Sequence, residues 1–208
     1  LHMQPVEIDC GPEVRFQLTA EALRALDPAP AGVIIASPAN PTGTIIPEAE
    51  LKAIAEVCRE RNISVISDEI YHGLSYVGPT PSMLQFEPNA LIVNSFSKYW
   101  SMAGWRLGWL ILPEAEVPQA RARVGNMFLT PATLSQHAAL IAMDCETERE
   151  ANIDVYRANR ALMLDALPAM GLRSIAPPDG AFYIYADIGH LTDDSIGFCE
   201  ALLRETGV

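Results

Sequence analysis

The amino-acid sequence predicts an α/β fold, with a mostly parallel sheet flanked by helices and part of a smaller α+β C-terminal domain. Short runs rich in β-branched residues alternate with helical patterns in the first half of the chain. These runs are apolar at consecutive positions, as in strands of a parallel sheet that is covered on both faces. In the second half, helical patterns dominate up to about residue 170.

The first half reads as strand, helix, strand. The run "GVIIAS" at residues 32–37 predicts the first strand. After Pro47, apolar residues recur at the helical spacing i, i+3, i+4, i+7: Leu51, Ile54, Ala55 and Cys58. Three more strands are predicted at residues 63–67, 90–95 and 107–112.

The second half begins with two helical patterns, "PEAEVPQARARV" and "PATLSQHAALIAM", and a long helix is predicted from Thr147 to about Ala169. The run "AFYIYADI" at residues 181–188 predicts a strand, and a last helix is expected from about Asp194. We expect a domain boundary near residue 145. Residues 1–145 would form part of a large domain, and residues 146–208 a connecting helix and part of a small domain.

Charge and cysteine usage narrow the class of protein. The net charge is −12, which disfavours binding to nucleic acid and to anionic membranes, and no apolar run approaches the roughly 18 residues that span a bilayer. The cysteines are far apart and form no C-x-x-C pair: Cys10, Cys58, Cys145 and Cys199. We therefore expect reduced thiols, a cytoplasmic location and no metal site.

Polar motifs follow three of the predicted strands. "SPANPTG" follows the first, "SDEIYHGLSY" brings Asp68 to the end of the second, and "SFSK" ends at Lys98 after the third. Ligands of open parallel sheets bind beyond the carboxyl ends of the strands. An amide, a carboxylate and an amine are thus expected at one sheet edge.

Each motif alone has a simpler interpretation. Asn-Pro-Thr-Gly is a good turn, Asp68 resembles a helix cap, and Lys98 and Arg106 would suit an exposed loop. The joint order favours a shared site, because Asn40 is followed after 28 residues by Asp68, three later by Tyr71, 27 later by Lys98 and eight later by Arg106.

The three motifs, together with "SFSKYWSMAGWRLGW", resemble the fold-type I pyridoxal-phosphate enzymes, and among them the class I/II aminotransferases. The resemblance covers essentially all 208 residues, through "GAFYIYADI". It implies that the parallel sheet belongs to the large domain of a pyridoxal-phosphate-dependent transferase, with pyridoxal 5'-phosphate as the cofactor.

The resemblance also implies catalytic roles. Lys98 would form the Schiff base with the cofactor aldehyde and then move the substrate's α-proton, which requires a neutral amine kept away from carboxylates. Asp68 would bind the pyridine nitrogen, because strand alternation turns Glu69 to the opposite face. Asn40 and Tyr71 would hydrogen-bond the phenolic oxygen of the cofactor.

The phosphate contacts implied by the resemblance come from one segment. Ser95 and Ser97 would donate hydroxyl hydrogen bonds, and Arg106 a guanidinium. The family's chains are longer at both ends, and the missing parts supply further cofactor contacts and the arginine that binds the substrate carboxylate. We therefore expect a fragment, with His2–Met3 as a cloning remnant, that is weak or inactive alone.

The implied function is an aminotransferase that exchanges an amino group between an amino acid and a 2-oxo acid, as a homodimer to which residues 126–136 contribute. Two alternatives stay open. A β-lyase of the same fold would release ammonia and pyruvate without an acceptor. An aminotransferase-like sensor domain of a transcription regulator would carry a winged-helix segment upstream.

Overall fold

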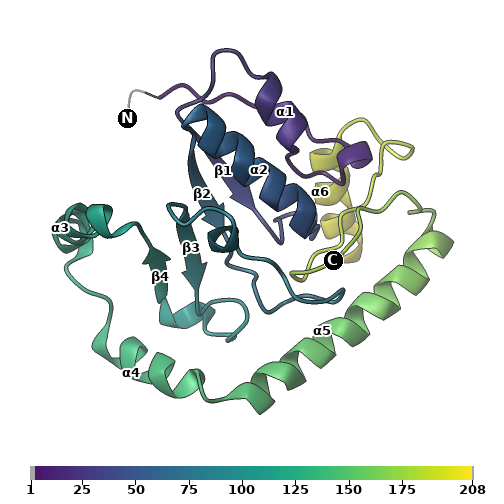
Figure 1. Ribbon diagram of the computed structural model, residues 1–208. Helices are drawn as coiled ribbons and strands as arrows, with labels where there is room; N and C mark the ends of the chain where they lie inside the picture. The colour runs from purple at the N-terminus through teal and green to yellow at the C-terminus, as the bar shows by residue number, and fades with distance from the viewer. Residues whose placement is uncertain (1–2, 208) are drawn as a thin grey trace.

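The computed structural model describes residues 3–207, so His2 of the expected cloning remnant lies outside the described part. The sheet has the order β1-β2-β3-β4, with bounds Gly32–Ala36, Ser64–Asp68, Leu91–Ser95 and Gly108–Ile111 (Figure 1). The pairs β1–β2 and β2–β3 are parallel, and β3–β4 is antiparallel. The predicted α/β fold with a mostly parallel sheet flanked by helices is confirmed.

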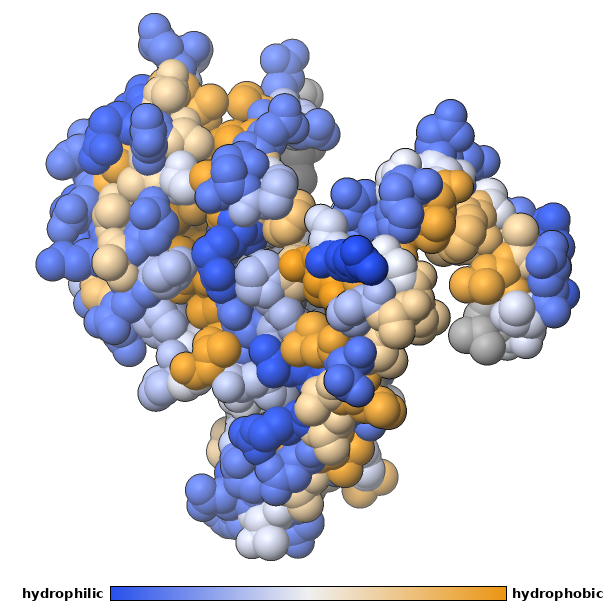
Figure 2. All heavy atoms as spheres, turned by 90° about the vertical axis from the view of Figure 1, so that its right-hand side faces the viewer, coloured by the Kyte–Doolittle hydropathy of each residue, from blue (hydrophilic) through white to orange (hydrophobic). Residues whose placement is uncertain are grey.

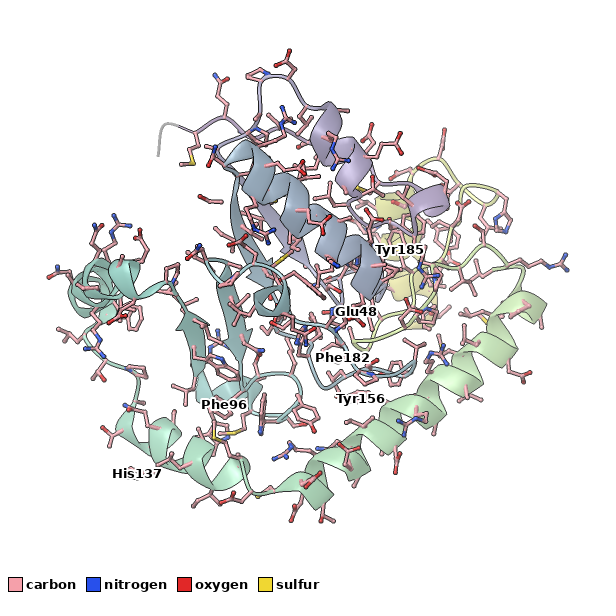
Figure 3. All side chains as sticks on the ribbon, in the orientation of Figure 1. Glu48, Phe96, His137, Tyr156, Phe182 and Tyr185 are labelled. Carbon is pink, nitrogen blue, oxygen red and sulfur yellow. The ribbon has the colours of Figure 1, made fainter. Side chains whose placement is uncertain are left out.

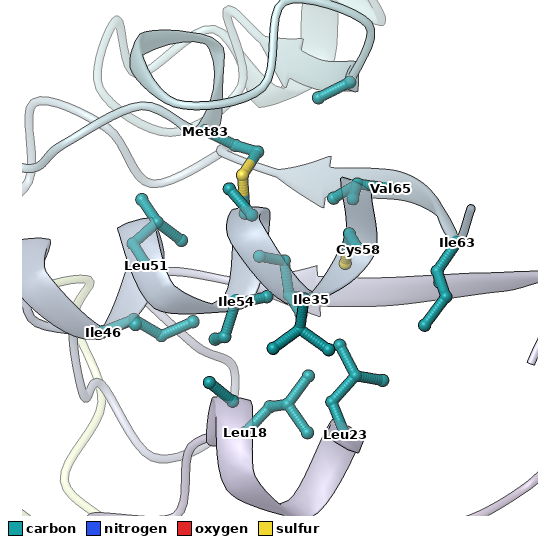
Figure 4. Close-up of a cluster of buried hydrophobic side chains, with 14 of the residues drawn as sticks. Leu18, Leu23, Ile35, Ile46, Leu51, Ile54, Cys58, Ile63, Val65 and Met83 are labelled. Atoms are coloured by element: carbon teal, nitrogen blue, oxygen red, sulfur yellow. The ribbon is translucent and has the colours of Figure 1, made fainter. Parts of the chain in front are cut away.

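The helices of the first half cover one face of this sheet. α1 (Ala20–Ala25) and α2 (Glu48–Arg61) lie over β1 and β2 (Figure 1). The core between these helices and the sheet contains the predicted apolar stripe of α2 and residues of α1 and of the strands (Figure 4). It includes Leu23, Ile35, Leu51, Ile54, Cys58, Val65 and Ile92. Burial of these side chains fixes the sheet against α2 and thereby the position of the strand ends.

The opposite face of the sheet differs from the prediction. Ile35 of β1 is 5% exposed, whereas its neighbour Ile34 is 73% exposed, and Leu110 of β4 is also exposed. The prediction of strands covered on both faces is therefore wrong for these described positions. The reason is geometric: successive side chains of a strand point to opposite faces, and α1 and α2 cover only one.

The second half is mainly helical, as predicted. α3 (Val117–Phe128) and α4 (Thr133–Ala142) lead to α5 (Glu146–Ala166), which runs along the outside of the molecule (Figure 1).

α6 (Ser195–Thr206) ends at Gly207 in the left-handed conformation and stands apart as an arm (Figure 2). Short 3₁₀ helices occupy Pro12–Val14, Met83–Gln85, Ala103–Trp105, Glu114–Glu116 and Leu167–Met170. α5 begins next to the expected boundary at residue 145, but the division into two domains stays a prediction.

The strand predicted at residues 181–188 does not form. This segment makes only isolated bridges, Ile175 with Ala186 and, just before it, Ser75 with Gly180. Alternating apolar residues give a strand only where a neighbouring chain completes a hydrogen-bonded ladder. Within residues 3–207 no such ladder is available to the segment, and its backbone bonds go to loops instead.

Among the described residues, no helix is both long enough and apolar enough to cross a membrane.

Candidate active site

The carboxyl ends of the three parallel strands lie side by side. Ala36 pairs with Asp68 across β1 and β2, and Asp68 pairs with Val93 across β2 and β3. Asp68 is half-buried, and its Oδ1 accepts a hydrogen bond from the backbone N–H of Ile70 at 3.0 Å. The sequence thus correctly predicts that the motifs after the three strands converge on one edge.

Lys98 lies in the turn after β3 in an aromatic environment. Its Nζ is 5.6 Å from the centroid of the Tyr71 ring and 5.5 Å from that of Phe182. Within residues 3–207 Lys98 takes part in no ion pair. The chain has one other lysine, Lys52, which is exposed on α2. Lys98 is therefore the one lysine of the chain at the sheet edge, and its surroundings match the expectation of an amine kept away from carboxylates.

Tyr71 is buried beside this lysine. Its hydroxyl shares a hydrogen bond with the hydroxyl of Tyr183. Burial raises the pKa of Tyr71 well above its usual value, and the hydrogen bond to Tyr183 and the nearby Asp68 act in the same direction. Tyr71 is consequently a neutral hydrogen-bonding group over the ordinary pH range.

Ser95 and Ser97 form a pair of hydroxyls at the end of β3. Their oxygens are 2.9 Å apart, and Ser95 Oγ also lies 3.0 Å from the carbonyl oxygen of Leu107. The Ser97 N–H donates to Ser95 Oγ at 3.0 Å. Both hydroxyls are only partly buried, so they can turn towards an anion at this edge.

The backbone of Arg106 lies close to Ser95 and Ser97, but its guanidinium does not contact these serines in the described structure. The residue has a φ of 52° and is exposed, and Nη1 donates to the carbonyl oxygen of Ala103 at 3.0 Å. Its backbone neighbour Leu107 accepts the hydrogen bond from the Phe96 N–H at 3.1 Å, which fixes Arg106 close to the serine pair. A rotation of this exposed side chain is required for it to bind the same anion as Ser95.

Asn40 lies in the loop at the carboxyl end of β1. The loop is closed by the hydrogen bonds from the N–H of Ala39 to the carbonyl of Thr44, at 3.0 Å, and from Gly43 to Ala39, at 2.8 Å. Asn40 itself is exposed. The segment therefore has the geometry of a turn, as its sequence alone suggests, and also presents the amide near the sheet edge.

Glu69 serves a different purpose from its neighbour Asp68. It is 4% exposed, and Oε1 accepts hydrogen bonds from Ser67 Oγ at 3.1 Å, Ser82 Oγ at 3.0 Å and the Met83 N–H at 2.9 Å. This carboxylate holds the loop after β2 against the core. The expectation that Glu69 turns away from Asp68 agrees with these contacts.

Two aromatic residues of the site were not predicted from the sequence. Phe182 and Tyr183 belong to the segment that was expected to be a strand, yet both contact Tyr71, with ring centroids 5.5 Å and 5.6 Å away. Phe182 also stacks on Tyr156 of α5, and Figure 3 shows the two between the sheet and that helix. The sequence feature that could have indicated these contacts is Gly180, because a glycine permits two backbones to approach each other closely.

That approach is visible in the contacts of residue 180. The Gly180 N–H donates to the carbonyl of Gly43 at 2.8 Å, and the Ala181 N–H donates to that of Leu74 at 2.9 Å. A Cβ at position 180 would lie 2.6 Å from the oxygen of Leu74 and 2.8 Å from Pro38 Cγ. The three loops are thus joined by backbone hydrogen bonds, which place Phe182 beside Lys98 and Tyr183 beside Tyr71.

The groups at this edge fit the chemistry of a phosphorylated pyridine aldehyde. An amine outside any described ion pair suits the aldehyde, and a carboxylate at a strand end suits a protonated ring nitrogen. A neutral phenol suits the ring's phenolic oxygen, and paired hydroxyls suit a phosphate.

Known proteins have sequences similar to this chain. The family model for "Aminotransferase class I and II" matches residues 1–208. A valine–pyruvate aminotransferase of Mycobacterium tuberculosis is 50% identical over 212 residues, which cover 100% of this chain and 55% of that protein. An aspartate/prephenate aminotransferase of Thermus thermophilus is 36% identical, over 98% of this chain and 54% of that protein.

Solved structures agree with the sequence comparisons. An aminotransferase from Mycobacterium tuberculosis superposes with a TM-score of 0.94 at 49% identity, covering 98% of this chain and 54% of that one. The aspartate aminotransferase of Thermus thermophilus with maleate gives 0.88 at 32% identity, covering 96% and 53%. The chain spans about half the length of the relatives that it matches. It belongs to the class I and II aminotransferase family, whose members depend on pyridoxal phosphate.

Proposed function

We propose that the intact protein is a pyridoxal-phosphate-dependent aminotransferase that moves an amino group between an amino acid and a 2-oxo acid. The observation that carries the proposal is the position of Lys98, which lies beside Tyr71 at the edge where β2 ends with Asp68. When bound, pyridoxal phosphate supplies an aldehyde carbon and a ring that withdraws electrons.

Lys98 is the proposed nucleophile and proton carrier. Its neutral Nζ would hold the aldehyde of the cofactor, and the free amine would take up the substrate's α-proton. The aromatic rings of Tyr71 and Phe182 lie near Nζ and provide an apolar neighbourhood for this amine.

Asp68, Tyr71 and Asn40 are the proposed contacts to the ring. The Asp68 carboxylate would accept a hydrogen bond from the protonated ring nitrogen and so favour the positively charged ring. Tyr71, whose raised pKa keeps it protonated, would donate to the phenolic oxygen, and so would the Asn40 amide.

Ser95, Ser97 and Arg106 are the proposed phosphate contacts. The two hydroxyls lie 2.9 Å apart, close enough to donate to oxygens of one phosphate. Arg106 adds a charge-assisted contact when its guanidinium leaves the carbonyl of Ala103.

Valine with pyruvate is the first donor and acceptor pair to assay, because the relative with that name shares 50% of the residues. Aspartate as donor is the second pair, from the more distant relative. Transfer must require both the amino acid and the 2-oxo acid. Release of ammonia and pyruvate without an acceptor would identify a β-lyase instead and would overturn the proposal.

The 208 residues on their own are expected to transaminate weakly or not at all, since they correspond to only about half of each relative. A turnover rate for this chain equal to that of the intact protein would contradict the expectation.

We also infer a cytoplasmic homodimer. The unpaired state of Cys10, Cys58, Cys145 and Cys199 supports a reducing compartment. Exposed apolar side chains between residues 126 and 136, namely Met127, Phe128, Leu129 and Leu134, support a contact between two copies through this segment.

A further inference from the structure

The hydroxyl of Tyr183 lies against the hydroxyl of Tyr71 at a partly buried position. The two rings are edge to face, with an interplanar angle of 74°, and their hydroxyls share a single hydrogen bond. Tyr71 in turn lies against Lys98. Tyr183 therefore reaches the amine's surroundings only through Tyr71.

The direction of this hydrogen bond decides what Tyr71 can do. Each phenol has one proton to donate and lone pairs to accept. When Tyr71 donates to Tyr183, its proton is engaged. When Tyr183 donates to Tyr71, the proton of Tyr71 is available to a third group on the Lys98 side, and hydrogen bonds in such a chain strengthen one another.

We propose that Tyr183 is a positioning residue that acts through Tyr71. Without an acceptor near Lys98, Tyr71 donates to Tyr183 and is held protonated. When an anionic oxygen lies beside Tyr71, the bond reverses, so that Tyr183 donates to Tyr71 and Tyr71 donates to that oxygen. The identity of the acceptor as the cofactor's phenolic oxygen rests on the proposed function, whereas the coupling between the two phenols does not.

The surroundings support a role for the hydroxyl of Tyr183 beyond packing. The hydrogen bonds of Gly180 and Ala181 to two other loops fix the backbone before Tyr183, and Phe182 stacks on Tyr156. The groups that act on Tyr71 are Tyr183 itself, Asp68 at the end of β2 and Lys98 after β3. Both the burial and the hydrogen bond to Tyr183 raise the pKa of Tyr71.

The first test uses the intact protein without cofactor, with tyrosines carbon-13-labelled at Cζ, and follows each phenol by NMR as pH rises. Loss of a signal in Tyr71→Phe assigns Tyr71. In Tyr183→Phe, which keeps the ring, the midpoint of Tyr71 should shift, because Tyr71 loses the hydroxyl with which its own hydroxyl shares a hydrogen bond. Tyr71→Phe should shift the Tyr183 signal, since the coupling is reciprocal. Tyr185→Phe is the matched control, because Tyr185 packs edge-on against Phe16 instead.

The second test uses the protein loaded with pyridoxal phosphate and follows the visible absorption of the lysine-bound cofactor against pH. Weaker donation by Tyr71 leaves more negative charge on the phenolic oxygen, so Tyr183→Phe should move the midpoint upward by about half a pH unit. In a Tyr71→Phe background the same substitution should have no effect.

Unchanged titration of Tyr71 in Tyr183→Phe, or an equal shift of the visible midpoint with and without Tyr71, would overturn the proposal. Absence of any visible band in the unsubstituted protein would contradict the proposed function, while the cofactor-free titration would still decide the coupling of the two phenols.

Discussion

At the scale of single residues, the environment of Lys98 explains how an acidic chain retains a reactive amine. The chain has 26 Asp and Glu residues against 14 Lys and Arg, yet the described contacts of Nζ are with the rings of Tyr71 and Phe182. A carboxylate in direct contact would hold the amine as an ammonium ion. Glu69, the acid nearest in sequence to Asp68, is instead engaged by Ser67, Ser82 and Met83.

The join at Gly180 gives a stability prediction. Gly180→Ala places a Cβ 2.6 Å from the Leu74 carbonyl oxygen, so the two backbones must separate. We expect the free energy of unfolding to fall by about 1–3 kcal/mol, measured by urea denaturation. Gly104→Ala is the control, because a Cβ at position 104 meets nothing within 4 Å. Equal losses for both variants would show that the close approach does not constrain the fold.

Cys58 gives a pH prediction. Burial in the core raises the pKa of this thiol from 9.0 to about 11. Between these values the folded state keeps the thiol proton while the unfolded state loses it, so stability is full below pH ~9 and falls as pH rises towards ~11.

The matching measurement is the urea midpoint at pH 8 and pH 11 for Cys58→Ala and for Cys199→Ala, whose thiol is exposed. Cys58→Ala should lower stability at pH 8 by leaving a small cavity. Between pH 8 and pH 11, however, it should lose less stability than Cys199→Ala. The ionisation of Tyr71 and Tyr76, whose pKa values are also raised, remains in both variants. An identical pH dependence in the two variants would be inconsistent with a thiol held protonated in the core.

At the scale of elements, the sequence predicts those parts whose partners lie nearby in the chain. β1 to β3 and α2 agree with their predicted ranges to within one residue at most ends, because each strand pairs with the next strand along the chain. The segment at 181–188 has strand-like alternation but lacks a complete partner strand in the described residues. Strand pairing and the burial of each sheet face are properties of the assembled sheet. This is why the strand at 181–188 was predicted wrongly and Ile34 was wrongly expected to be buried.

α6 gives an element-scale prediction. The helix buries no side chain within the described residues, and its start is capped by Asp194, whose Oδ1 accepts the Gly197 N–H at 3.0 Å. Because tertiary packing contributes little, Asp194→Ala should weaken the first turn by about 0.5–2 kcal/mol. Faster amide hydrogen exchange over residues 195–199 would report this. Asp193→Ala is the control, and equal exchange in both variants would argue against the cap.

At the scale of the whole molecule, exposed apolar residues on α3 and α4 predict the oligomeric state. Leu134 is 72% exposed on α4, inside the segment proposed to contact a second copy. The intact protein should have the mass of a dimer by light scattering, and Leu134→Asp should weaken dimerisation at least tenfold because it places a charge in an apolar interface. Ile196→Asp on α6 is the control, with 73% exposure outside that segment. A monomeric intact protein, or equal effects of the two variants, would contradict the homodimer.

The site as a whole was predictable only in part. The convergence of Asp68, Tyr71 and Lys98 follows from motifs at the ends of adjacent parallel strands. Phe182 and Tyr183 come from more than 80 residues further along the chain, and backbone hydrogen bonds between loops bring Phe182 to Lys98 and Tyr183 to Tyr71. No local pattern encodes such a long-range join. The orientation of the Arg106 guanidinium depends on a single exposed rotamer, which is equally beyond local sequence rules.

The central claim is that Lys98 is the lysine that binds the cofactor, and the chain offers a simple test because it contains only Lys52 and Lys98. The protein is mixed with pyridoxal phosphate, reduced with borohydride, digested and analysed by mass spectrometry. We predict stoichiometric label on Lys98, retained in Lys52→Arg, lost in Lys98→Arg and strongly reduced in Asp68→Ala. Label on Lys52 or on the terminal amine, with none on Lys98, would contradict the account.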